Sequence, residues 1–181
     1  MAIVTIKGTA TVEDLLKMPK DGRKYELVDG EILVSPAGMK HGEDVVKILL
    51  IFATYLDSKP IGKVYPDNVG IWFPSGNLRS PDVFYVRNET LPNGESPEGF
   101  GELVPDLAVE VLSPSDSLTQ LGRKIGEFLQ CGVPIVWLAD PARKTVTMYR
   151  SLSEIRQFAS EDIITAEPVL PGFSCPVSRF F

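Results

Sequence analysis

Residues Pro105 to Pro141, PDLAVEVLSPSDSLTQLGRKIGEFLQCGVPIVWLADP, decide the fold that the chain is expected to adopt. The pattern predicts a strand, a helix and a second strand, the unit that places two parallel strands side by side. Apolar residues fill the first strand from Leu107 to Leu112, as in strands covered on both faces, but Glu110 interrupts them. A buried carboxylate is costly unless it is paired, protonated or bound to a cation, so Glu110 is a candidate metal ligand.

The length and composition are those of a globular protein with one domain. With 181 residues, 44% apolar and 23% charged, the chain can bury a sizeable core. We expect a single domain over residues 1–181, with its core at about residues 23–150. The net charge of −6 argues against a surface built for broad, sequence-independent phosphate binding. A nuclease is not excluded, because a local cleft and bound divalent ions can oppose the net charge.

The sequence predicts a protein of the cytoplasm. Cys131 and Cys175 belong to no paired metal motif and are expected to be reduced thiols. The first ten residues, MAIVTIKGTA, lack the charged start, apolar core and cleavage site of a signal peptide. The most apolar segment, Val45–Leu56, is interrupted by polar residues and is too short to span a bilayer.

Capping and turn signals predict the elements of the N-terminal part. Thr11 is expected to cap a short helix whose first turn is acidic. Asp29-Gly30 predicts the turn of a hairpin between Lys24–Val28 and Glu31–Val34. Apolar side chains at helical spacing predict a helix from His41 to Leu56.

A strand or a bent hairpin is expected at residues 63–73, and further strands at residues 79–86 and 144–150. Residues 88–101 are rich in Pro, Gly and Asn and predict an exposed loop near the mouth of the site. We therefore predict an α/β fold with a mixed sheet, in the order α-β-β-β-α-β, preceded by a helix and a hairpin.

Two acidic residues from neighbouring strands and one lysine form the candidate site. Asp82 stands at the start of an apolar strand, and Glu110 interrupts the next one. At about 100° per residue, Lys124 lies at the edge of the apolar stripe of the following helix, with its ammonium toward Glu110. Arg123 and Glu127 are expected to face away from the stripe.

Two carboxylates beside a lysine are suited to a hard cation such as Mg²⁺ or Mn²⁺. The ion would lower the pKa of a bound water and offset charge on a phosphate. The lysine would orient that water or stabilise the charge that develops during the reaction. This is the chemistry of phosphodiester hydrolysis.

Each residue of the candidate site also has a purely structural interpretation. Asp82 would hydrogen-bond the local backbone after a proline. Glu110 would form a buried ion pair or lie at a partly exposed strand end. Lys124 would extend its apolar stem along the border of the helical stripe.

Five segments and Lys124 also resemble a known family. The segments are GRKYELVDGEILVSP, KHGEDVVKILLIFATYL, RSPDVFYV, PDLAVEVLSPSD and GVPIVWLADP, at residues 22–36, 40–56, 79–86, 105–116 and 132–141. In this order they resemble the Uma-type bacterial family of restriction-endonuclease-like proteins, in the PD-(D/E)XK superfamily. The resemblance runs from about residue 11 to about residue 178. It implies a mixed sheet flanked by helices and Mg²⁺-dependent cleavage of nucleic acid.

The resemblance implies roles residue by residue. Asp82 matches the motif aspartate and Glu110 the (D/E) position, and the backbone carbonyl of Val111 is implied as a further ligand. Leu112 stands where the superfamily usually has lysine. Lys124, on the following helix, resembles a migrated replacement for that lysine.

Two more residues are candidates for an additional part of the site. His41, the only histidine, matches a histidine that recurs in the family; a helix cap or a solvent-facing residue is the alternative. Glu26 lies in the first strand of the hairpin and would face the cleft as a third acid. Asp106 repeats the Pro-Asp dipeptide but is expected only to begin a strand, and Phe128 stands where family members often have tyrosine.

The sequence thus predicts a metal-dependent endodeoxyribonuclease, a hydrolase in which Asp82 and Glu110 hold Mg²⁺, or Mn²⁺ in its place. Lys124 would position the water or stabilise charge. DNA is the expected substrate, and a homodimer is expected because such nucleases often pair to cut two strands. The alternative is a catalytically inactive module of the same fold that binds nucleic acid or protein, which the acidic composition and the absence of a basic stripe leave open.

Overall fold

A six-stranded mixed sheet is the centre of the computed structural model, which describes residues 9–19, 21, 23–35 and 38–181. Its strands lie in the order β11-β10-β9-β8-β6-β3; β8 and β9 run parallel and the other neighbours antiparallel. They are β3 Gly62–Pro66, β6 Val83–Arg87, β8 Leu107–Val111, β9 Ile135–Asp140, β10 Thr145–Tyr149 and β11 Ile155–Phe158. Residues 1–8, on which the predicted lack of a signal peptide depends, lie outside the described residues.

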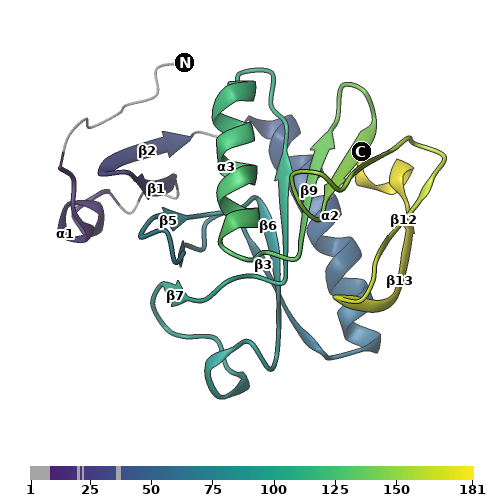
Figure 1. Ribbon diagram of the computed structural model, residues 1–181, viewed down its shortest axis with the longest axis horizontal. Coiled ribbons are helices and arrows are strands. Elements are labelled where there is room, and N and C mark those ends of the chain that lie inside the picture. Colours follow the sequence, from purple (N-terminus) through teal and green to yellow (C-terminus); the bar gives the residue numbers. More distant parts are fainter. Residues whose placement is uncertain (1–8, 20, 22, 36–37) are drawn as a thin grey trace.

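Two helices cover opposite faces of this sheet (Figure 1), α2 at Met39–Ser58 and α3 at Leu118–Gln130. Successive side chains of a strand point to opposite faces, so β8 directs Val109 toward α2 and Ala108 toward α3. The apolar strand is thus covered on both faces, as predicted. By the same alternation Glu110 lies on the face of Ala108, toward α3.

The core elements follow one another as α2, β3, β6, β8, α3 and β9, which confirms the predicted α-β-β-β-α-β order and the mixed α/β fold. Thr11 caps α1, Val12–Leu16, as predicted. The cap of α3 is Ser117, whose hydroxyl accepts the N–H of Gln120. In the described part of the chain, no helix is both long enough and apolar enough to cross a membrane.

A second sheet packs against the other side of α3, in the order β2-β1-β5-β4-β7 (Figure 1). Phe73, just after β4, stacks on Phe128 of α3 with 5.1 Å between the ring centroids. On the far face of this sheet, Leu15 of α1 packs with Leu27 and Ile32. The strands are β1 Lys24–Val28, β2 Glu31–Ser35, β4 Ile71–Trp72, β5 Leu78–Arg79 and β7 Gly101–Glu102.

Two of the predicted strands are each divided between the two sheets. Residues 63–73 form β3 in the first sheet and β4 in the second, and residues 79–86 run from β5 into β6. The second break falls at Ser80-Pro81, because proline lacks the N–H that a strand ladder needs. The Ser80 hydroxyl donates to the carbonyls of Asp67 and Val69, at 2.5 and 2.9 Å, and thereby ties the two crossing segments together.

The connection from β6 to β8 lies at the end of the sheet opposite to Asp82. It contains the 3-10 helix η1, Pro92–Gly94, and the short strand β7. Because β6 leads away from Asp82 and β8 leads back toward Glu110, the loop at residues 88–101 cannot border both residues. Its predicted place near the mouth of the site is therefore wrong.

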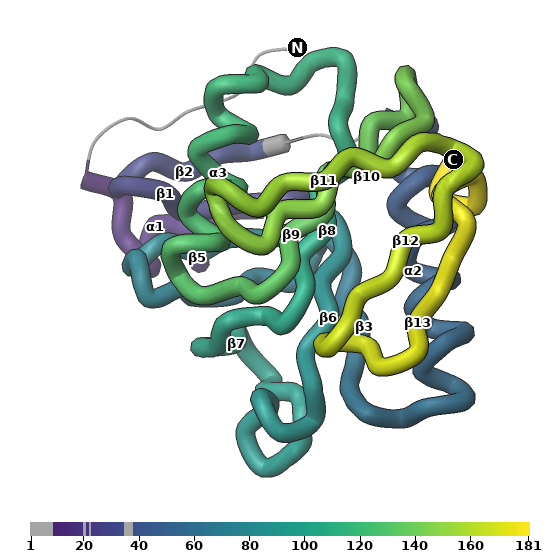
Figure 2. The backbone as a smooth tube through the Cα atoms, turned by 45° about the vertical axis from the view of Figure 1, so that its right-hand side comes forward, coloured from purple at the N-terminus to yellow at the C-terminus, as the bar shows by residue number. Residues whose placement is uncertain are grey.

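A C-terminal hairpin covers α2 (Figure 2). It consists of β12, Ile163–Ala166, and β13, Leu170–Pro176, and the 3-10 helix η2, Val177–Phe180, follows. Trp137 of β9 lies within an aromatic cluster, with ring centroids 5.6 Å from Phe52 of α2 and 5.7 Å from Phe180. This cluster joins the helix, the sheet and the hairpin in one core.

The aromatic cluster yields a test of this core. Phe52 is 0% exposed, so Phe52→Ala is expected to lower the free energy of unfolding by about 3–5 kcal/mol, from lost burial and the cavity left behind. Urea denaturation followed by circular dichroism measures the change. The matched control is Val46→Ala on the same helix, which is 52% exposed and should change stability by less than about 0.5 kcal/mol. Equal effects of the two substitutions would contradict the packing described.

Candidate active site

Asp82 and Glu110 lie side by side at the edge of the antiparallel ladder between β6 and β8. The register pairs Val83 with Val109, and its extension by one residue places Asp82 opposite Glu110. The backbone N–H of Val111 donates to Asp82 Oδ2 at 2.8 Å. Both acids are buried, with Asp82 at 4% and Glu110 at 5% exposure. Two predicted site residues are therefore brought together.

Lys124 reaches this pair from α3, as predicted. Its Nζ lies 2.7 Å from Glu110 Oε1 and 3.2 Å from Glu26 Oε1. Glu110 Oε1 is buried and is paired with the Lys124 ammonium. The predicted third acid, Glu26, is also buried and accepts the N–H of Ser80 at 2.8 Å. The two core strands, α3 and the hairpin thus all contribute to one cluster.

Lys24 is a member of the cluster that the sequence analysis missed. It begins β1, and its Nζ lies 2.7 Å from Asp82 Oδ1 as donor and ion-pair partner. Lys24 and Glu26 are two residues apart on one strand, so they share the face opposite to Tyr25 and Leu27. That alternation was the signal in the sequence: a cleft-facing Glu26 implies a cleft-facing Lys24.

His41 lies at the edge of the site, in the first turn of α2. Its Nε2 is 3.6 Å from Asp82 Oδ1, and its buried Nδ1 has no hydrogen-bond partner among the described residues. The interaction with Asp82 raises the pKa of His41 above its usual value, although partial burial opposes this. His41 is therefore positioned to touch the carboxylate that is predicted to bind a metal.

A second set of ion pairs and hydrogen bonds connects α3 to the second sheet. Arg79 donates from Nε, at 2.8 Å, and from Nη2 to Glu127 Oε2, and its Nη1 lies 3.6 Å from Glu26 Oε2. Asn77 and Ser75 donate to Glu127 Oε1 at 2.8 and 2.7 Å. The expectation that Glu127 faces away from the apolar stripe of α3 is wrong, because these contacts enclose its side chain.

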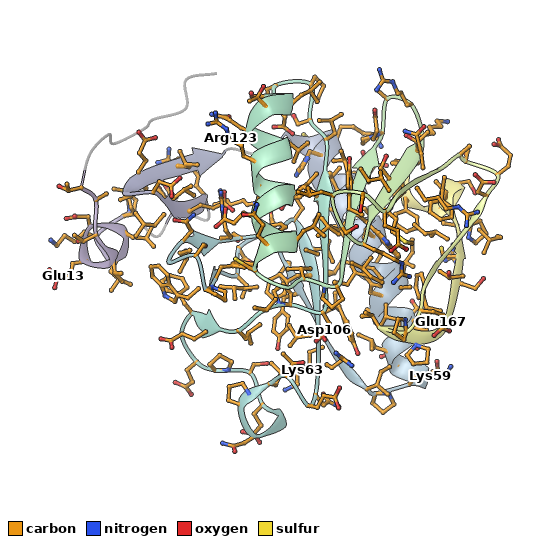
Figure 3. All side chains as sticks on the ribbon, viewed as in Figure 1. Glu13, Lys59, Lys63, Asp106, Arg123 and Glu167 are labelled. Atoms are coloured by element: carbon orange, nitrogen blue, oxygen red, sulfur yellow. The ribbon has the colours of Figure 1, made fainter. Side chains whose placement is uncertain are left out.

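The face of α3 that carries Arg123 is exposed, as predicted (Figure 3). Glu127 differs because the second sheet, which the sequence did not reveal, covers its side of the helix. Since Glu127 lies about one turn after Lys124, its contacts fix the helix that presents this lysine.

Asp106 has the structural role expected of it. Its carboxylate accepts the backbone N–H of Arg87 at 2.8 Å and the Arg87 Nε at 2.6 Å, and the Thr90 hydroxyl at 3.0 Å. It lies at the start of β8, toward the lower end of the molecule in Figure 3, whereas Glu110 is near the other end of that strand. The second Pro-Asp dipeptide therefore holds the β6–β8 connection.

Burial and neighbouring charges move the pKa values of the two central acids apart. Burial, the largest influence on both, raises the pKa of a carboxyl. In Asp82 the ammonium of Lys24 and the contact with His41 outweigh burial and hold the pKa far below its usual range. In Glu110 burial prevails over the opposing Lys124 and raises the pKa to about 7. Asp82 is therefore an anion at neutral pH, whereas Glu110 readily accepts a proton.

The donor atoms at this site fit a hard divalent cation. Asp82 and Glu110 offer carboxylate oxygens, and the Lys124 ammonium is the one partner of Glu110 Oε1 among the described residues. The N–H and C=O of one strand residue point to the same neighbouring strand, so the carbonyl of Val111 is directed toward Asp82, as its N–H is. Among the described residues no three His, Cys, Asp or Glu side chains are arranged around one metal position. A metal would therefore rest on two carboxylates and this carbonyl.

The chain is similar in sequence and in fold to proteins whose descriptions name a nuclease. The family model described as "Uma2: Putative restriction endonuclease" matches residues 12–178. A crystal structure of a "putative nuclease belonging to DUF820" from Anabaena variabilis ATCC 29413 superposes with a TM-score of 0.82, at 23% sequence identity, over 94% of this chain and 97% of that one. The two proteins share the fold. No curated protein matches the chain.

The ion pair between Arg79 and Glu127 yields a test of how the site is supported. Glu127→Gln is expected to lower the free energy of unfolding at pH 7 by about 2 kcal/mol, because Arg79 stays buried without its main partner. Burial tends to raise the pKa of Glu127, but its hydrogen bonds from Arg79 and Ser75 lower it below 4.5. The stabilisation is therefore complete above about pH 4.5 and lost as the pH falls further.

Urea denaturation at pH 7 and at pH 3 measures both effects. The matched control is Glu154→Gln, at an exposed ion pair with Arg150 whose loss should cost less than about 0.5 kcal/mol at either pH. A loss for Glu127→Gln that is no larger than that of the control at pH 7 would contradict the supporting role.

Proposed function

Because this chain belongs to the Uma2 family, described as "Putative restriction endonuclease", we propose that it is a Mg²⁺-dependent endonuclease that hydrolyses phosphodiester bonds in DNA. Mn²⁺ would serve in place of Mg²⁺, since both ions prefer oxygen ligands. The observation that carries the proposal is the convergence of Asp82, Glu110 and Lys124 from two adjacent strands and one helix.

The carboxylates of Asp82 and Glu110 and the carbonyl of Val111 would hold the cation. When bound, the ion would supply a water of lowered pKa and offset the negative charge of a phosphate. Lys124 would orient the attacking water or stabilise charge on the phosphoryl oxygens. Glu26, 3.2 Å from the Lys124 ammonium, would hold that ammonium in place. His41, with its Nε2 3.6 Å from Asp82 Oδ1, would orient that carboxylate.

Cations within the site offset most of the negative charge of its carboxylates. The cations Lys24, Lys124 and Arg79 are all close to the carboxylates, so the acids do not present a bare negative surface to a phosphate. Two copies acting together would cut both strands of a duplex, and on this ground we propose a homodimer. The alternative is a module of the same fold that binds nucleic acid or protein without cutting, and the experiments below separate the two.

Metal binding is expected to depend on Asp82. Asp82→Asn removes one charge but keeps an oxygen for the N–H of Val111, so the local backbone should be retained. We expect Mn²⁺ binding, measured by isothermal titration calorimetry, to weaken about tenfold or more. Asp57→Asn, at an exposed position of α2, is the control and should leave the affinity unchanged. Absence of Mn²⁺ binding by the wild-type protein, or unchanged binding by Asp82→Asn, would refute the metal site.

Cleavage is expected to depend on Lys124 in a way that metal binding does not. Lys124→Met should lower the cleavage rate by roughly 100-fold or more, as removal of one stabilising donor does in other enzymes, without weakening Mn²⁺ binding. The assay uses duplex, single-stranded and branched DNA with Mg²⁺, and Lys47→Met on α2 is the control. Mn²⁺ binding by a wild-type protein that cuts none of the three substrates would favour the inactive module.

A further inference from the structure

We propose that Lys24 is a built-in counter-cation of Asp82 that a divalent ion must displace in order to bind. The inference rests on the proposed metal site and concerns its regulation. It predicts that the affinity for the metal is limited by a residue of the hairpin, outside the α-β-β-β-α-β core.

The contact of Lys24 with Asp82 is direct and sheltered. The Nζ of Lys24 lies 2.7 Å from Asp82 Oδ1, and the exposed fractions of the two side chains are 11% and 6%. The other oxygen, Oδ2, accepts the N–H of Val111, so Oδ1 is the oxygen left to face a metal. A cation and the Lys24 ammonium therefore compete for the same atom.

The two lysines of the site differ in the ion pairs that each would lose when a metal binds. Lys124 contacts both Glu110 and Glu26, so it keeps a partner if Glu110 turns to a metal. Among the described residues, Asp82 is the one acid within ion-pair distance of Lys24. Metal binding at Asp82 would therefore leave Lys24 without its ion pair. The metal thus competes mainly with Lys24 and less with Lys124.

The charge balance of the cluster points the same way. With Glu110 ionised and His41 neutral, a divalent ion added to the cluster would reverse its net charge from −1 to +1, and like charges at such distances repel strongly in a buried site. Displacement of one ammonium relieves this repulsion. The charged groups, with His41 neutral, are the carboxylates of Asp82, Glu110, Glu26 and Glu127 and the cations of Lys24, Lys124 and Arg79.

The experiment measures Mn²⁺ affinity by isothermal titration calorimetry at one fixed pH. Lys24→Met is expected to bind Mn²⁺ about tenfold more tightly than the wild-type protein, because the competing charge is gone. Lys24→Arg keeps the charge and should bind within about twofold of wild type. Lys47→Met, which removes the charge of a lysine paired with Glu43 on α2, is the matched control and should also bind as wild type does.

Thermal unfolding supplies a second readout that does not depend on activity. Without metal, Lys24→Met should melt at a lower temperature than wild type, since Asp82 loses its partner, and Mn²⁺ should raise its melting temperature by more than it does for wild type. If Lys24→Met does not fold, Lys24→Gln takes its place, because the amide can still donate to Asp82 without a charge.

The outcomes separate this inference from the proposed function. If the wild-type protein binds Mn²⁺ and the uncharged Lys24 variant binds it no more tightly, the inference is overturned and the proposed metal site stands. Failure of both proteins to bind would overturn the metal site and the inference together. Tighter binding by the uncharged variant, with wild-type affinity in Lys24→Arg and Lys47→Met, is the result that supports it.

Discussion

The burial of Asp82 and Glu110 side by side is the constraint on which the rest of the structure depends. Two adjacent carboxylates with exposures of 4% and 5% repel each other and are poorly solvated, so the fold must bring cations to them. Lys24 and Lys124 meet this need from two different elements, each 2.7 Å from one acid. A divalent metal would meet the same need, and the proposed metal site rests on this.

The second sheet supports that cluster. Its hairpin brings Lys24 and Glu26 to the site, and its strand β5 ends in Arg79, whose contact with Glu127 fixes α3. The chain crosses between the sheets immediately before Asp82, so that this residue contacts both of them. Loss of the hairpin would therefore disturb the charges of the site and the helix that carries Lys124.

The core of the fold, Glu110 and Lys124 could be predicted from the sequence because each follows from a strong periodicity, whereas Asp82 was identified by its place at the start of a strand and by the family resemblance. Glu110 broke an apolar strand, and Lys124 lay at the border of a helical stripe. The second sheet could not be foreseen, since strands of two residues such as β4, β5 and β7 contain too few residues to show alternation. Without it, Glu127 was wrongly expected to face away from the apolar stripe of α3. Lys24 was missed although Glu26, its neighbour on the same face of β1, had been recognised.

The measurement that tests the central claim most directly is a crystal structure of the protein soaked in Mn²⁺, with anomalous scattering recorded at the manganese edge. We predict one anomalous peak between the carboxylates of Asp82 and Glu110, within coordination distance of the carbonyl of Val111, with the Lys24 ammonium moved away from Asp82. Absence of a peak there, with both acids still paired to their lysines, would contradict the account.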